Sequence, residues 1–169
     1  MLRKLLDSNE LRKLEIIEYL DSKENWVTLK ELSEQTGYSE NVLKKDISLM
    51  KQDYVEGTWE TSHKGIYFKL SENDSIDTIY RSFLKNSMAF QLLELLLYEN
   101  EAQIPELAES LFTSSSTLTR LIKRMNGLLV DTAIQIEINP CRVVGNEGTI
   151  RNFYGHYFYE CYSPFGVAV

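Results

Sequence analysis

A stretch of hydroxyl and basic side chains without any acidic residue lies between residues 113 and 125. Its cations are Arg120, Lys123 and Arg124, and its outward hydroxyl residues are Ser115, Ser116, Thr117 and Thr119. Guanidinium and ammonium groups neutralise phosphates, and an arginine can also donate two hydrogen bonds to guanine O6 and N7. These residue types therefore predict recognition of a nucleic acid, with Arg120 as the strongest single candidate.

A second set with related chemistry lies between residues 39 and 48. Its members are Ser39, Asn41, Lys44, Lys45 and Ser48. An asparagine can pair with adenine, and either lysine can bind a phosphate. Two acidic residues within the same stretch, Glu40 and Asp46, offset the two lysines. We therefore expect this set to be nearly neutral and to bind a nucleic acid less strongly than the first.

Both sets occupy the same place in an internal repeat with a constant offset of 75 residues. The apolar residues Leu29, Leu32, Leu43, Ile47 and Met50 recur as Ile104, Leu107, Leu118, Ile122 and Met125. Their i, i+3, i+4, i+7 spacing is helical and leaves one face of each second helix free of apolar residues. Each copy therefore indicates a helix, a tight turn and a second helix that carries the polar set.

The turn residues agree with this interpretation. Ser39 and Ser114 are suited to cap the second helices, because a serine hydroxyl accepts a backbone N–H of the first turn. Gly37 tolerates the positive φ with which a first helix commonly ends. The second copy has Phe112-Thr113 at this place, so its turn is expected to use another geometry.

The remaining patterns complete two winged units. A first helix is expected over residues 10–21, and β-forming residues around His63-Lys64-Gly65 predict a hairpin over 54–70. Lys64 at the tip of this hairpin is a further candidate for contact with DNA, although a plain hairpin turn explains it equally well. In the second half we expect helices over 76–99, 104–112 and 115–130 and a hairpin over 134–144.

The composition restricts the function. The net charge of −7 argues against indiscriminate nucleic-acid binding, so binding is expected to depend on the local basic faces. Cys141 and Cys161 are too few and too far apart for a disulfide framework, and together with the scattered His63 and His156 they do not form a spaced metal site. The sequence also lacks a glycine-rich phosphate loop and a nucleophile elbow. We therefore expect that the protein is not an enzyme and binds neither a cofactor nor a metal ion.

The two isolated cysteines indicate a cytoplasmic protein with free thiols, and the distribution of apolar residues indicates that it has no membrane partner. The longest apolar run, residues 92–97, is interrupted by Glu94 and falls far short of the ~20 residues that span a bilayer. The first seven residues lack the apolar core of a signal peptide.

The predicted fold class is mainly α with small β-hairpins, arranged as tandem winged helix-turn-helix domains. The expected domains are residues 1–72, 73–146 and 147–169, with the polar segment 71–75 between the repeats and a helix in the last part. That helix carries the aromatic residues Phe153, Tyr154, Tyr157, Phe158, Tyr159 and Tyr162. A large exposed aromatic stripe normally has a partner. We expect self-association or a C-terminal regulatory domain missing from this chain.

The segment that leads into this last helix resembles a known junction. Gly145, Glu147, Ile150 and Arg151 match the G-x-E-x-x-I-R motif that follows the second helix-turn-helix of Mga and AtxA-type virulence regulators. Together with the two winged units, the resemblance covers essentially the whole chain. It implies a DNA-binding transcription regulator whose phosphorylated histidines lie in regulatory domains outside this sequence, so no such role is expected for His63 or His156.

Two functions follow from these observations. The first is a transcription regulator that binds double-stranded DNA through the second helix of each helix-turn-helix. The alternative is a tandem winged-helix scaffold for protein interactions without intrinsic DNA binding, which the acidic net charge favours. Binding to a random duplex at low salt separates the two.

Overall fold

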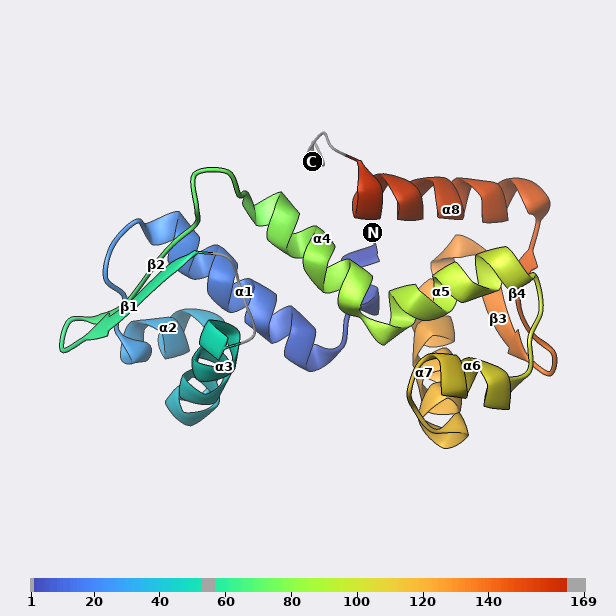
Figure 1. Cartoon of the computed structure of the whole chain (residues 1–169), viewed down its shortest axis with the longest axis horizontal. Helices are drawn as coiled ribbons and strands as arrows, with labels where there is room; N and C mark the ends of the chain where they lie inside the picture. The colour runs from blue at the N-terminus through green and yellow to red at the C-terminus, as the bar shows by residue number, and fades with distance from the viewer. Residues whose placement is uncertain (1, 53–56, 164–169) are drawn as a thin grey trace. The chain divides into compact units, whose positions relative to one another are not determined.

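A computed structural model describes residues 2–52 and 57–163 of the chain. These residues form α-helices and two antiparallel sheets of two strands each, so the predicted fold class is confirmed (Figure 1). The chain divides into two compact units. The N-terminal unit is Ser8–Phe83, and the C-terminal unit combines Met1–Asp7 with Leu84–Val169.

The N-terminal unit packs three helices against a hairpin. Its elements are α1 (Ser8–Lys23), α2 (Leu29–Thr36), α3 (Glu40–Gln52), β1 (Thr58–Ser62), β2 (Gly65–Lys69) and most of α4 (Ile76–Asn86). Its core contains Leu14, Ile17, Leu20, Leu32, Leu43, Ile47, Met50, Ile66 and Phe68. The expected beginning of the hairpin, residues 54–56, lies outside the described residues. The other hairpin residues pair as predicted, from Thr58 with Lys69 to Ser62 with Gly65.

The C-terminal unit repeats this plan and adds a helix. Its elements are the 3-10 helix η1 (Leu2–Leu5), α5 (Met88–Glu99), α6 (Ile104–Ser110), α7 (Ser115–Leu129), the 3-10 helix η2 (Val130–Thr132), β3 (Ile134–Ile138), β4 (Cys141–Gly145) and α8 (Glu147–Tyr162). Buried Leu118, Ile122 and Met125 place the apolar stripe of α7 inward, as its spacing predicts. Its opposite face is therefore available to a ligand.

The 75-residue repeat extends beyond the helices into both wings. In the N-terminal unit Val27 and Ile66 exchange two backbone hydrogen bonds of 2.8 Å. In the C-terminal unit Ala102 and Cys141, each 75 residues further on, exchange bonds of 2.9 and 2.8 Å. The same short bridge therefore fixes the returning strand of each hairpin to the residues just before the first helix of the helix-turn-helix.

The prediction of one long helix over residues 76–99 is wrong. The chain forms two helices, because α4 ends at Asn86 and α5 begins at Met88. Ser87 between them is buried, and its hydroxyl accepts the backbone N–H of Phe90 at 3.4 Å. A serine in this role gives the second helix its own N-cap, which the apolar periodicity alone does not reveal.

The compact units also differ from the expected domain limits at residues 72 and 146. Leu2, Leu5 and Leu6 are buried and belong to the C-terminal unit, although they begin the chain. The last helix, α8, belongs to the same unit. Burial of these apolar side chains decides where the two segments belong, and the order of the elements along the chain does not show it.

The aromatic stripe of α8 is exposed only in part. Phe153, Tyr154 and Tyr157 are buried, and the last two donate hydrogen bonds to the carbonyls of Leu93 (3.0 Å) and Phe90 (3.4 Å) on α5. The expectation that the whole stripe needs a partner outside the chain is therefore wrong for these three residues. The aromatic residues that stay exposed on α8 are Phe158, Tyr159 and Tyr162.

Replacing Gly65 with alanine is expected to destabilise the N-terminal unit by about 3 kcal/mol. Gly65 has φ 123°, and a Cβ there would lie 2.3 Å from the carbonyl oxygen of Val27. Both tryptophans of the chain, Trp26 and Trp59, lie in this unit, so denaturation followed by tryptophan fluorescence measures its stability. Gly37→Ala is the control, because its φ of 77° is strained but a Cβ there meets no atom within 4 Å. Equal losses for the two variants would contradict the steric argument.

Candidate nucleic-acid interface

The turn of the N-terminal helix-turn-helix is held by hydrogen bonds at both ends of α2. The Thr28 hydroxyl accepts the N–H of Glu31 at 3.1 Å and begins the helix. Gly37, in the left-handed conformation, ends it and donates its N–H to the carbonyl of Ser33 at 2.8 Å. The Ser33 hydroxyl in turn donates to the carbonyl of Tyr38 at 2.6 Å. These bonds fix the direction in which α3 leaves the turn.

The polar residues predicted for the N-terminal unit all lie at its surface. Exposed residues at the start and on the outward face of α3 are Ser39, Asn41, Lys44, Lys45 and Ser48. Lys64 is exposed in the turn between β1 and β2, where its N–H donates to the Ser62 hydroxyl at 3.1 Å. The fold therefore gathers the predicted residues of α3 on one helix face.

Asp46 differs from its expected role. The sequence suggested that it offsets Lys44 and Lys45, but its side chain is 5% exposed and accepts a hydrogen bond from Arg12 Nε at 2.5 Å. Its charge is therefore compensated from α1. Of the acidic residues on α3, Glu40 is exposed, so the outward face is more basic than the sequence suggests.

Lys51 adds to this face and was missed from the sequence. It lies one and two turns beyond Ser48 and Lys44, and its Nζ donates to the Thr61 hydroxyl of β1 at 3.1 Å. A groove of about 310 Å³ separates α3 from the hairpin, with these residues among its lining. The seven-residue spacing from Lys44 was the signal that could have identified Lys51, because residues i and i+7 share a helix face.

The side chain of Tyr38, in the turn between α2 and α3, lies against α1. Its hydroxyl donates to Glu15 Oε2 at 2.9 Å, and Arg12 lies 5.5 Å from the centre of its ring. The hydrogen bond to Glu15, with some desolvation, raises the pKa of Tyr38. The side chain is thus engaged with α1 at the turn.

The hydroxyl groups at the start of α7 form their own network. Ser114 is the N-cap, as predicted, and its hydroxyl accepts the N–H of Thr117 at 3.1 Å. Thr119 donates to the carbonyl of Ser115 at 2.8 Å. Ser115 and Ser116 are exposed, while Thr117 and Thr119 are half-buried. The two serines are therefore the hydroxyl groups most accessible to a ligand.

The three cations predicted on α7 have different surroundings. Arg120 and Lys123 are exposed, and Arg120 also lies 3.3 Å from the Thr117 hydroxyl, to which it donates. Arg124 instead donates to the carbonyls of Leu5 (2.9 Å) and Leu6 (3.0 Å). Its guanidinium therefore fastens the N-terminal segment to α7, a contact that the sequence did not indicate.

The wing of the C-terminal unit is attached to α7 by Asn126. The Asn126 amide donates to the carbonyl of Ile136 and accepts its N–H, both at 2.8 Å. Asn126 and Ile136 lie 75 residues after Lys51 and Thr61, which join α3 to β1 in the N-terminal unit. Both repeats therefore join their second helix to the wing at the same two positions.

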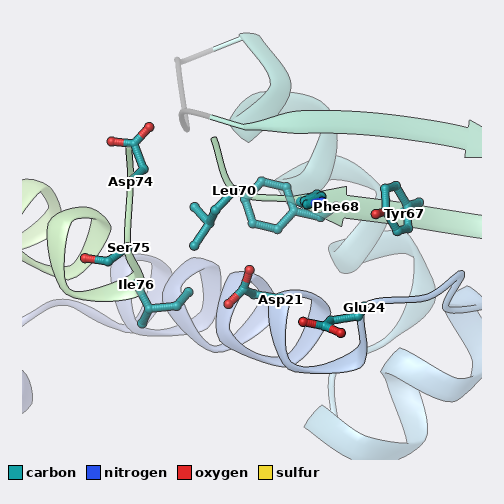
Figure 2. A pocket seen from close by; sticks show the side chains of 9 residues that line it. Asp21, Glu24, Tyr67, Phe68, Leu70, Asp74, Ser75 and Ile76 are labelled. Carbon is teal, nitrogen blue, oxygen red and sulfur yellow. The ribbon is translucent and has the colours of Figure 1, made fainter. Parts of the chain in front are cut away.

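The charged side chains that line a second cavity of the N-terminal unit are mostly negative (Figure 2). It measures about 520 Å³, and the carboxylates of Asp21, Glu24 and Asp74 line it beside Phe68 and Leu70. Desolvation, with the nearby charge of Glu24, raises the pKa of Asp21. Carboxylates repel phosphate, so this side of the unit is unsuited to a nucleic acid.

Other kinds of site have little support in the part of the chain that the structure describes. Among residues 2–52 and 57–163 no three His, Cys, Asp or Glu side chains are grouped to hold a metal ion. No helix in these ranges is long and apolar enough to cross a membrane. Cys141 and Cys161 are buried free thiols, and burial raises the pKa of Cys141 to about 11.

Models of known protein families match both units of the chain. Residues 72–158 match the model of the Mga helix-turn-helix domain. Residues 7–59 match the model of the helix-turn-helix domain of the M protein trans-acting positive regulator. Each match contains one of the two helix-turn-helix motifs described above.

Several curated relatives carry the word regulator in their names. The chain is 29% identical over 95% of its length to a protein of Streptococcus pneumoniae whose name includes the words "trans-acting regulator", and it covers 33% of that protein. It is 29% identical over 89% of its length to the capsule synthesis positive regulator AcpA of Bacillus anthracis, covering 32% of it. The anthrax toxin expression trans-acting positive regulator of the same organism is 23% identical over 88% of the chain, which covers 31% of it. The chain thus spans about a third of the length of these relatives.

Proposed function

We propose that the chain binds double-stranded DNA through α3 and α7, because it belongs to the Mga helix-turn-helix family of transcription regulators and exposes cations on both helices. In a helix-turn-helix the second helix lies in the major groove, and its first turns contact the base edges. In this proposal α7 places Ser115, Ser116 and Arg120 at the bases and Lys123 at a phosphate.

The observation that carries this proposal is the outward face of α7. Arg120 and Lys123 are exposed on it, and no acidic residue occurs between Thr113 and Met125. The N-terminus of α7 adds a favourable electrostatic contribution, because its unpaired backbone N–H groups attract an anion. On an acidic chain, such a face concentrates the attraction for phosphate in one place.

The N-terminal unit contributes a second, comparable surface. The exposed lysines of α3 are Lys44, Lys45 and Lys51, and the pairing of Asp46 with Arg12 removes one of the two acidic charges that would offset them. We therefore propose that α3 binds the DNA backbone more strongly than its amino-acid composition suggests, with Asn41 at a base edge and Lys64 at a phosphate.

The wider role is also part of the proposal. Two relatives of about three times this length are named as positive regulators of capsule synthesis and of toxin expression. We infer that this chain supplies the DNA-binding part of such a regulator, in the cytoplasm where the DNA lies. Exposed Phe158, Tyr159 and Tyr162 on α8 support self-association or contact with a C-terminal regulatory domain.

Fluorescence anisotropy with a labelled duplex of random sequence tests the proposal. We expect binding near 50 mM salt that weakens steeply towards about 200 mM, because each neutralised phosphate releases counterions. The absence of binding at the lower salt concentration would contradict the proposal and favour a scaffold for protein interactions. A titration with the labelled strand alone controls for attraction to any polyanion.

A further inference from the structure

The turn of the C-terminal helix-turn-helix exposes a phenylalanine completely. Phe112 lies between α6 and α7, and its side chain is 98% exposed. Its φ is 52°, in the left-handed region that bulky residues rarely adopt. A large apolar side chain thus adopts a strained backbone conformation without any burial that would compensate for it.

Hydrogen bonds of the turn impose this conformation. The N–H of Phe112 donates to the carbonyl of Glu109 at 3.1 Å, and the N–H of Thr113 donates to that of Ala108 at 2.9 Å. Backbone bonds of this kind commonly accompany a residue of positive φ at the end of a helix. The side chain of Phe112 does not contribute to holding the turn in this shape.

The repeat shows which residue the fold itself prefers here. The position 75 residues earlier is Gly37, which has φ 77° in the equivalent turn. The expectation that the second turn uses another geometry is wrong for φ, since both residues are left-handed. It holds for the hydrogen bonds, because the carbonyl of Ser33 accepts the N–H of Gly37, whereas the equivalent carbonyl of Ala108 accepts the N–H of Thr113. Glycine adopts this region without strain, whereas phenylalanine does not. Stability therefore does not explain Phe112, and strain that stability does not explain is typical of functional sites.

Its place in the fold indicates what it contacts. Phe112 precedes the N-cap Ser114 by two residues, and exposed Ser115 and Ser116 follow directly. We propose that Phe112 makes an apolar contact with duplex DNA beside the first turn of α7, against thymine methyl groups and the faces of the deoxyribose rings. This inference rests on the proposed function, which brings the start of α7 to the groove.

The contact has a distinct thermodynamic signature. Phe112 carries no charge, so its replacement does not change the number of counterions that DNA binding releases from the phosphates. Replacing it should lower the affinity by the same factor at every salt concentration, whereas loss of a cation should also flatten the salt dependence. The dependence of affinity on salt therefore distinguishes Phe112 from Arg120 and Lys123.

The test uses the anisotropy titration with Phe112→Gly, which supplies the residue found at position 37. We expect binding to weaken about fivefold, which corresponds to roughly 40 Å² of apolar surface no longer buried. The slope of affinity against salt should stay unchanged, and the thermal midpoint should equal or exceed that of the wild type. Phe112→Leu should retain most of the affinity. Tyr98→Ala is the matched control, because Tyr98 is a strongly exposed aromatic residue at the end of α5, and it should leave the affinity unchanged.

Two outcomes separate failure of this inference from failure of the proposed function. If the wild type binds the duplex and Phe112→Gly binds it equally well, the contact does not exist and the inference is overturned. If the wild type itself fails to bind at low salt, the proposed function is wrong and the inference fails with it. A Phe112→Gly variant that loses affinity together with thermal stability would also contradict the inference, because Phe112 would then have a structural role.

Discussion

The double variant Arg120→Ala/Lys123→Ala is expected to bind duplex DNA about 50-fold more weakly than the wild type and to reduce the salt slope by about two. Both side chains are exposed on α7, on the face opposite its buried stripe. Each is expected to neutralise a phosphate, and Arg120 has in addition the geometry to pair with guanine. Anisotropy titrations at several salt concentrations measure both quantities.

The control for this experiment removes two positive charges elsewhere in the same unit. Arg142 and Arg151 are suitable, because Arg142 Nε lies 2.9 Å from Glu137 and Arg151 Nη2 lies 2.6 Å from Glu147. The variant Arg142→Ala/Arg151→Ala should change the affinity only slightly. If it weakens binding as much as Arg120→Ala/Lys123→Ala does, net charge controls binding and the assignment of α7 is wrong. Arg124 is left intact, since its guanidinium holds the carbonyls of Leu5 and Leu6.

Replacing Arg12 with methionine is expected to destabilise the N-terminal unit by about 3 kcal/mol, because it leaves the charge of a buried aspartate without its partner. Asp46 is 5% exposed and Arg12 is 17% exposed. Arg12 also donates to Asn9 Oδ1 at 2.9 Å. The double variant Arg12→Met/Asp46→Leu removes both charges and should recover most of the lost stability.

Denaturation followed by the fluorescence of Trp26 and Trp59 reports on this unit, where both residues lie. The control is the exposed pair Lys30 and Glu34, whose charged atoms are 4.0 Å apart on α2. Its removal by Lys30→Met should cost only a few tenths of a kcal/mol. If Arg12→Met lowers the free energy of unfolding no more than Lys30→Met does, the buried charge of Asp46 does not need Arg12 as its partner and the argument is wrong.

The sequence predicted the repeated helix-turn-helix units because their apolar spacing is local and occurs twice. The cap Ser114 and the two hairpins also follow from residues close together in the chain. The apolar periodicity did not reveal the end of α4 at Ser87, because it continues across that helix boundary into α5. Local rules also failed for the N-terminal leucines, whose partners are more than a hundred residues away.

The candidate site shows the same limit. The sequence correctly placed Arg120, Lys123 and Lys44 at the surface, since the helical period decides which side of a helix is apolar. It could not show that Asp46 pairs with Arg12 or that Arg124 binds a backbone carbonyl, because those partners lie on other elements. Which charges remain available to a ligand therefore depended on tertiary contacts.

The joints between second helix and wing also differ in stiffness. Asn126 holds both backbone groups of Ile136, whereas Lys51 reaches Thr61 through a single exposed bond at the end of a long side chain. An exposed single bond opens more readily, so the N-terminal wing should follow irregularities in the shape of a bound duplex while the C-terminal wing keeps its own shape. The N-terminal unit would thus have the more flexible wing and the C-terminal unit the more rigid one. Replacing Asn126 with alanine should speed amide exchange at Ile136, because the Asn126 side chain accepts the Ile136 N–H.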